Sequence, residues 1–134
     1  MVDENRILVK TGLDLLNQGK RDGIRELIYN NDLHLKKINS KEVSWYITPV
    51  INASGRMGEP DKAARMLLSD DPSEAGGLAK YIIKLNEKRK NLGETVWNSV
   101  MPRAKKCFEE TKEKFVFVSG KSIQRGITLS LIHI

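Results

Sequence analysis

Cysteine is nearly absent from this sequence, and its scarcity excludes two kinds of structure. The 134 residues contain one cysteine, Cys107, so neither an internal disulfide nor a zinc site built from several thiolates can form. Two lysines precede Cys107 and Phe108 follows it, as at the edge of a helix. We expect this thiol to be buried or chemically idle.

Long apolar runs are also lacking. No stretch approaches the roughly 20 apolar residues that a membrane helix needs. The chain starts Met-Val-Asp-Glu, with two acidic residues, whereas a secretory signal is basic and then apolar. We therefore expect a cytoplasmic protein without a membrane partner. The length allows one domain at most.

The sequence shows no arrangement of residues suited to catalysis. Its two histidines, His34 and His133, are isolated from each other and from carboxylates at metal-ligand spacing. Asp71 is placed to cap a helix, and Asp70 favours the same helix N-terminus by its charge. A glycine-rich phosphate loop and a Ser-His-Asp order are missing as well. The sequence therefore predicts no catalytic residue and no metal ligand.

The positive charge is concentrated in the second half of the chain. The net charge is +6, and residues 80–134 hold 12 Lys or Arg against 5 Asp or Glu. A basic half suits a polyanionic partner, because each Lys or Arg that pairs with a phosphate releases counterions. A solvated lysine-rich helix face without any partner explains the same pattern.

Apolar residues at helical spacing predict a mainly α fold. The predicted helices cover residues 3–18, 21–30, 40–51 and 61–69, followed by a long helix from residue 72. Gly19 is a natural stop for the first helix, and Ser40 can cap the third. Pro49 predicts a kink or an early end of the third helix before Asn52.

The long helix has the clearest start signal. Asp71 can cap it, Pro72 fits its first position, and Glu74 can reach back as the third residue of a capping box. Apolar residues then repeat at heptad-like spacing, which predicts a seam packed within the same chain. They are Leu78, Ile82, Leu85, Leu92 and Val96. Pro102 is expected to interrupt this helix.

One short strand is predicted after the long helix. Residues 115–118 read Phe-Val-Phe-Val and are followed by Ser119 and Gly120, the pattern of a buried strand. A single strand cannot form a sheet, so we expect its partner strands to lie beyond this chain.

The segment from Asn52 to Gly58 has the composition of an anion-binding turn. It reads Asn-Ala-Ser-Gly-Arg-Met-Gly, and its glycines predict a flexible turn between two helices. Small residues at 53–55 would leave room for an anion, Arg56 offers a planar fork that matches phosphate, and Asn52 can donate from its amide. A plain helix–helix turn with a surface arginine explains these residues as well.

The motif Ile51–Gly58 resembles the Asn-Ala-Ala-Gly-Arg-hydrophobic-Gly motif of the RecJ exonucleases, members of the DHH phosphoesterase superfamily. Ser54 departs from the usual alanine, a small change that should leave the turn intact. Further segments resemble RecJ in the same order and spacing, and the whole resemblance extends over residues 3–128. These segments are residues 4–9, 67–71 and 85–90.

The resemblance implies a domain organisation. Residues 1–71 would be the C-terminal helical part of an α/β DHH domain, residues 72–113 a long connecting helix, and residues 114–128 the start of a second α/β domain with its first strand. Residues 129–134 match the in-frame translation of a sequencing-adapter end. We expect these six residues to be an artefact without a part in the fold.

The resemblance also implies an activity. RecJ enzymes are metal-dependent 5′–3′ exonucleases of single-stranded DNA used in DNA repair and recombination, with Mn²⁺ or Mg²⁺ held by Asp and His residues. Those ligands would precede Met1, so we expect this fragment to bind no metal and to be inactive alone. Its partner would be single-stranded DNA, and the intact enzyme would be a monomer.

Two pairs of residues are the expected contacts to the DNA backbone. By resemblance, Arg56 contacts a phosphate and Asn52 is its neighbour in the site. Arg125 and Gly126 form the second pair, in a segment that resembles a phosphate-handling loop of the second domain. An alternative stays open, in which the chain is a non-enzymatic basic helical module that binds nucleic acid or protein.

Overall fold

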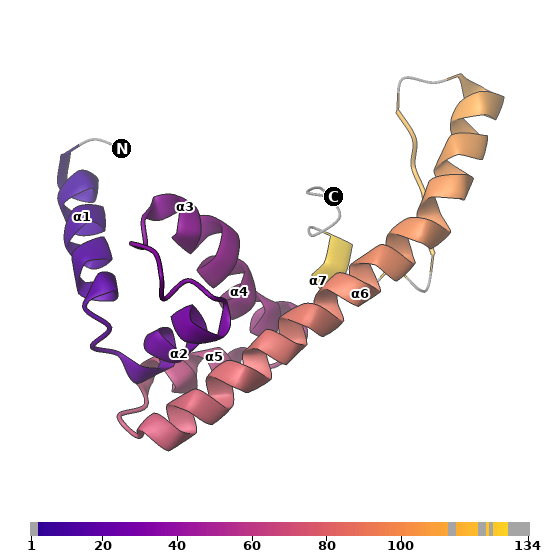
Figure 1. Cartoon of the computed structure of the whole chain (residues 1–134). Helices are drawn as coiled ribbons and strands as arrows, with labels where there is room; N and C mark the ends of the chain where they lie inside the picture. Colours follow the sequence, from indigo (N-terminus) through magenta and orange to yellow (C-terminus); the bar gives the residue numbers. More distant parts are fainter. Residues whose placement is uncertain (1–2, 113–114, 121–122, 124, 129–134) are drawn as a thin grey trace. The chain divides into compact units, whose positions relative to one another are not determined.

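The structure, a computed structural model, describes residues 3–112, 115–120, 123 and 125–128, and these residues are mainly helical, as predicted. They form two compact units, residues 1–86 and residues 87–134. The elements in Figure 1 are α1 (Asp3–Asn17), α2 (Asp22–Asn30), α3 (Ser40–Glu42), the π-helical turn η1 (Val43–Ile47), α4 (Thr48–Arg56), α5 (Pro60–Leu68), α6 (Pro72–Thr111) and α7 (Arg125–Thr128).

Helix α1 adds little to the core of the first unit. It has no buried residue, and its apolar residues Ile7 and Leu8 are each 68% exposed. The side-chain amide of Asn17 fixes the end of this helix, since it donates to the Ile38 carbonyl and accepts from the Ile38 amide, both at 2.8 Å. The end of α1 is therefore held by these two hydrogen bonds together with Leu16, a partly buried residue that packs against the core.

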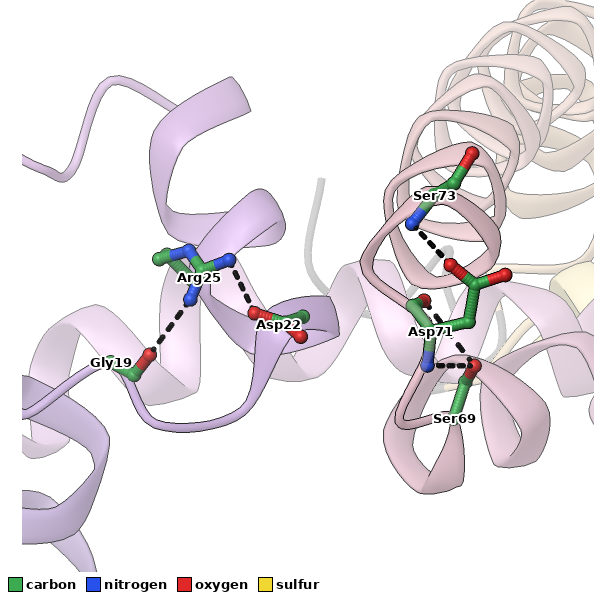
Figure 2. A network of polar contacts seen from close by, with 6 residues as sticks. All are labelled: Gly19, Asp22, Arg25, Ser69, Asp71 and Ser73. Carbon is green, nitrogen blue, oxygen red and sulfur yellow. Dashed lines mark hydrogen bonds and ion pairs between the residues drawn. The ribbon is translucent and has the colours of Figure 1, made fainter.

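The turn between α1 and α2 is built around Gly19 and Arg25. Gly19 has a φ of 63°, a left-handed conformation that favours glycine, so the predicted stop of the first helix is confirmed. Figure 2 shows the Arg25 guanidinium donating to the Gly19 carbonyl at 3.4 Å and pairing with Asp22. One arginine thus links the turn to the first residue of α2.

The core of the first unit forms where α5 packs against both α2 and α4. Leu27 of α2, Val50 of α4 and Met66 of α5 are each at most 3% exposed, and Ile82 of α6 belongs to the same cluster. Burying side chains of this size contributes about 1.5–3 kcal/mol each. This cluster is what fixes α4 against its neighbours.

The approach between α2 and α5 is so close that it requires glycine. A Cβ atom on Gly23 would lie 2.3 Å from the Met66 carbonyl oxygen and 2.8 Å from Met66 Cγ. No side chain can occupy such a position without moving the backbone of one helix.

A capping box starts the third predicted helix one residue earlier than expected. The cap is Asn39 and not Ser40, because the Asn39 side chain accepts from the Lys41 amide at 2.8 Å. The Glu42 carboxylate in turn accepts from the Asn39 amide at 3.2 Å. These two reciprocal bonds satisfy donors that the helix start would otherwise leave open.

Pro49 does not end this helix, so the prediction of a kink or an end before Asn52 was wrong in its position. Pro49 lies in the first turn of α4, directly after η1, and its fixed φ is compatible with a helix. The irregularity comes before it, in η1, where the Thr48 amide donates five residues back to the Val43 carbonyl. Helix α4 then runs through Asn52 to Arg56.

The joint between α5 and α6 is polar. Asp71 caps α6 as predicted, since its carboxylate accepts from the Ser73 amide at 2.9 Å (Figure 2). Glu74 does not complete the predicted capping box. It accepts from the Ser69 hydroxyl at 2.7 Å and pairs with Arg65, while the Asp71 amide, its expected donor, donates to the Ser69 hydroxyl at 3.2 Å. These two partners lower the pKa of the Glu74 carboxyl.

Helix α6 follows the predicted seam but not the predicted interruption. Ile82, Leu85 and Val96 are at most 7% exposed, so packing of the seam within the same chain is confirmed for these residues. Pro102 lies inside the helix, which continues to Thr111. The expected interruption was wrong, because a proline removes one bond from a helix of 40 residues and the turns on both sides remain.

The predicted strand is not formed in the second unit. Residues 115–118 belong to neither a helix nor a strand, and Phe115 and Phe117 are 74% and 81% exposed. The prediction of a buried strand was wrong for this chain, because a strand without a partner has no ladder of hydrogen bonds to hold it. The Arg103 guanidinium fixes the segment at one point by donating to the Ser119 carbonyl at 2.8 Å.

Helix α7 is a single turn anchored by one apolar side chain. Ile127 is 1% exposed, and its Cγ2 lies 4.0 Å from the position of a Cβ atom on Gly93 of α6.

Cys107 of α6 is a free, half-buried thiol. Within the described part of the chain, no helix is long and apolar enough to cross a membrane. The predicted artefact at residues 129–134 lies outside the described residues.

We predict that Gly23→Ala lowers the free energy of unfolding by about 1–3 kcal/mol, the usual cost of an extra methyl group in a packed site. The added Cβ would overlap the Met66 carbonyl oxygen. Chemical denaturation measures this change. Gly12→Ala in α1 is the matched control, because nothing lies within 4 Å of its Cβ position. That control should gain about 0.5–1 kcal/mol, and equal effects of the two substitutions would contradict the prediction.

Candidate nucleic-acid interface

The motif that was predicted as a flexible turn is the end of a helix. Residues 52–56 belong to α4, so this part of the prediction was wrong. The Gly58 amide donates to the Gly55 carbonyl at 3.2 Å, and the Glu59 amide donates to the Ser54 carbonyl at 2.8 Å. These are the two bonds of a Schellman motif. Gly58 has a φ of 84°, so it ends α4 in the conformation that favours glycine.

The three small residues of the motif lie in different surroundings. Ala53 and Ser54 are 0% and 2% exposed, so their size serves the packing of α4 and not the access of an anion. The Ser54 hydroxyl donates to the Ile51 carbonyl at 2.8 Å, which satisfies a buried polar group. Gly55 is exposed, with nothing within 4 Å of its Cβ position. Of the three, Gly55 leaves open space beside the helix.

Asn52 and Arg56 lie four residues apart on α4, so their side chains share one face of the helix. Asn52 is exposed and Arg56 is half-buried. Gly55 is three residues from Asn52 and belongs to the same side. We call Asn52, Gly55 and Arg56 the α4 face. It combines an amide donor, a guanidinium and an uncovered stretch of backbone.

The electrostatics of the α4 face differ from those of a phosphate loop. It lies at the C-terminal end of a helix, where the backbone carries a partial negative charge. The amides of Gly58 and Glu59, which follow it, donate within the Schellman motif. An anion at this face would therefore have to be held by side chains, above all by the Arg56 guanidinium, and not by these backbone N–H groups.

A contact that the sequence did not predict involves Glu59, three residues after Arg56. The Tyr81 hydroxyl of α6 donates to the Glu59 carboxylate, at 2.9 Å from each oxygen. The Lys62 ammonium lies 5.7 Å from the centre of the Tyr81 ring. The bond to Glu59 raises the pKa of the Tyr81 hydroxyl, because a phenolate would face a carboxylate. The partners are 22 residues apart, and no sequence pattern links them.

The second predicted pair lies in the second unit, whereas the α4 face belongs to the first. Arg125 and Gly126 open the single turn α7. Arg125 is exposed and Gly126 is half-buried. The predicted loop therefore has a helical start, with Ile127 as its buried anchor.

The polar residues outside these pairs have structural surroundings. In residues 3–112, 115–120, 123 and 125–128, no group of three or more His, Cys, Asp or Glu side chains is placed to hold a metal ion. His34 stacks on Tyr29 with ring centres 4.9 Å apart, and Asp70 pairs with Arg21 at 3.6 Å. His133 lies outside the described residues.

The chain is similar in sequence to several curated RecJ proteins, although no protein-family model matches it. It is 38% identical over 100 residues to the single-stranded-DNA-specific exonuclease RecJ of Thermus thermophilus, a match over 75% of this chain. It is 36% identical over 90 residues to the same enzyme of Bacillus subtilis, a match over 67% of this chain. The chain spans only 15% and 12% of the length of these relatives.

Solved structures agree with the sequence comparison. A crystal structure of exonuclease RecJ bound to manganese matches with a TM-score of 0.78 and 31% identity, over 95% of this chain and 31% of that chain. RecJ of Thermus thermophilus in complex with Mn²⁺ matches with a TM-score of 0.75 and 33% identity, over 92% and 18%. Its complex with Mg²⁺ matches with a TM-score of 0.65 and 38% identity, over 73% and 15%.

We predict opposite effects for two alanine substitutions in the motif. Gly58→Ala should lower the free energy of unfolding by about 1–2 kcal/mol, because a Cβ atom is strained in the left-handed conformation. Gly55→Ala should raise it by about 0.5–1 kcal/mol, since alanine favours helix and nothing obstructs its methyl group. Thermal melts of the two variants measure both shifts, and a loss of stability in Gly55→Ala would mean that Gly55 is needed for the fold.

Proposed function

The chain belongs to the RecJ family, and on this basis we propose that it forms part of a single-stranded-DNA-specific exonuclease, in which the α4 face binds the DNA backbone. The observation that carries the proposal is that Asn52 and Arg56 lie on the same face of α4. A guanidinium can give a phosphate two parallel hydrogen bonds, and an amide can donate to a phosphate or sugar oxygen beside it.

This proposed contact positions DNA and reads no bases. Contacts to phosphate and sugar fix the register of a nucleic acid but carry no direct sequence information. The open backbone at Gly55, between the two donors, lets a strand approach the helix without meeting a side chain. Arg125 and Gly126 are proposed as a second backbone contact, from the second domain.

Cleavage is assigned to other parts of the proposed enzyme. RecJ proteins have been solved with Mn²⁺ and with Mg²⁺, and we propose that the intact enzyme uses either ion in two-metal hydrolysis, with ligands outside this segment. In this proposal residues 1–71 end the catalytic domain, residues 72–113 connect it, and residues 114–128 begin the second domain. The intact enzyme would act as a monomer in the cytoplasm, where its DNA substrate is found.

Arg56→Ala should weaken the binding of single-stranded DNA by about 1.5–3 kcal/mol, the scale of hydrogen bonds to a charged group. The slope of log affinity against log salt should fall by about one unit, equally for all base sequences. Arg56→Lys should restore only part of the affinity, because an ammonium lacks the planar fork. Fluorescence anisotropy over a salt series measures both quantities, in a full-length protein that carries this segment and in the chain alone.

Arg6→Ala is the matched control for this experiment. It removes the same charge from an exposed position on α1, so it reports the general electrostatic attraction between a basic protein and DNA. Arg56→Ala should change affinity and salt slope more than the control does. Equal effects of the two substitutions would remove Arg56 from the site.

The chain alone should have no nuclease activity. Without the metal ligands it lacks both the activated water and the charge that stabilises the leaving oxygen. Incubation with end-labelled single-stranded DNA and Mn²⁺ tests this, with a protein-free reaction as the baseline. Degradation that EDTA abolishes would show that the segment itself holds a catalytic metal.

A further inference from the structure

We propose that Tyr81 is a positioning residue for the α4 face: it ties the turn after Arg56 to α6, and so fixes the direction from which the guanidinium meets DNA. This role rests on the proposed function and adds to it a residue that lies outside the motif. It is carried by the hydrogen bonds between the Tyr81 hydroxyl and both Glu59 carboxylate oxygens, each at 2.9 Å.

Glu59 connects two structures through its two ends. Its backbone amide donates to the Ser54 carbonyl at 2.8 Å and closes the Schellman motif that ends α4. Its carboxylate accepts the hydroxyl of Tyr81 from α6. Arg56 is the last residue of α4. A shift of Glu59 would therefore change the geometry of the helix end on which Arg56 lies. The tyrosine therefore acts on the last turn of α4 through a single intermediate residue.

Helix α6 gives this link a fixed base. Ala79 and Ile82, which lie two residues before and one residue after Tyr81, are both 0% exposed. The phenol has two side-chain torsions, so little conformational entropy is lost when it is held in place. The Lys62 ammonium lies over its ring, and the Lys62 amide donates to the Glu59 carbonyl at 3.2 Å. Glu59 is thus bound through its amide, its carbonyl and its carboxylate.

The charge of Glu59 makes its placement matter for DNA. A carboxylate lies three residues after Arg56, and a mobile carboxylate at this place would compete with a phosphate for the guanidinium. The bond to Tyr81 sets the direction of this carboxylate. Loss of that bond should therefore weaken phosphate binding even though Tyr81 itself carries no charge.

A double-mutant cycle tests the role. Tyr81→Phe keeps the ring beside Lys62 and removes the hydroxyl, so it should lower the affinity for single-stranded DNA about five- to tenfold, the scale of one ordinary hydrogen bond. The melting temperature should stay unchanged. In an Arg56→Ala background, Tyr81→Phe should have no further effect on affinity, because its action passes through Arg56. A purely structural role would give the same loss in both backgrounds, with a lower melting temperature.

Tyr29→Phe is the matched control, since it removes a hydroxyl from a tyrosine of α2 whose ring stacks on His34. It should leave DNA affinity unchanged. Unchanged affinity in Tyr81→Phe, while Arg56→Ala weakens binding, would overturn the role of Tyr81 and leave the proposed function in place. Unchanged affinity in Arg56→Ala would overturn the proposed function itself.

Discussion

The left-handed backbone of Gly58 is the constraint on which the first unit depends. Its φ of 84° ends α4 and lets the Glu59 amide reach the Ser54 carbonyl, so that α5 starts within two residues and packs against both α4 and α2. That packing brings the Met66 carbonyl so close to α2 that only Gly23 fits. One turn therefore sets the end of α4 and also the close approach of α5 to α2 at Gly23.

The sequence predicted the features that depend on near neighbours. The Asp71 cap and the stop at Gly19 involve groups a few residues apart, so the residue types alone predict them. The sequence predicted that Glu74 completes a capping box, whereas it pairs with Arg65. Arg65 lies nine residues earlier and comes within reach only when α5 and α6 meet. The prediction of a strand at residues 115–118 was wrong for a related reason, since strand pairing depends on partners that local sequence does not supply.

The residues of the candidate site remain a prediction, and the sequence was wrong about the local structure in which they lie. Two glycines and a nearby proline suggested a loop, yet Ala53 and Ser54 are buried, and their packing offsets the cost of about 1 kcal/mol that Gly55 brings to a helix. Burial is a property of the folded core, so the sequence alone could not show whether this segment forms a loop or the end of a helix. The contact of Tyr81 could not be predicted for the same reason, because only the packing of α6 beside the α4–α5 turn brings Tyr81 to Glu59.

A phosphate contact at the C-terminal end of a helix has a consequence for how DNA can move. The helix end carries roughly half a negative charge, which the full positive charge of Arg56 would have to outweigh, and the amides of Gly58 and Glu59 that follow donate within the Schellman motif. A side chain that holds one phosphate without reading bases has the same affinity for each phosphate of a strand. In the exonuclease that we propose, the strand can therefore advance by one nucleotide between contacts of equal free energy. A cradle of backbone amides would hold each phosphate more tightly and would oppose that movement.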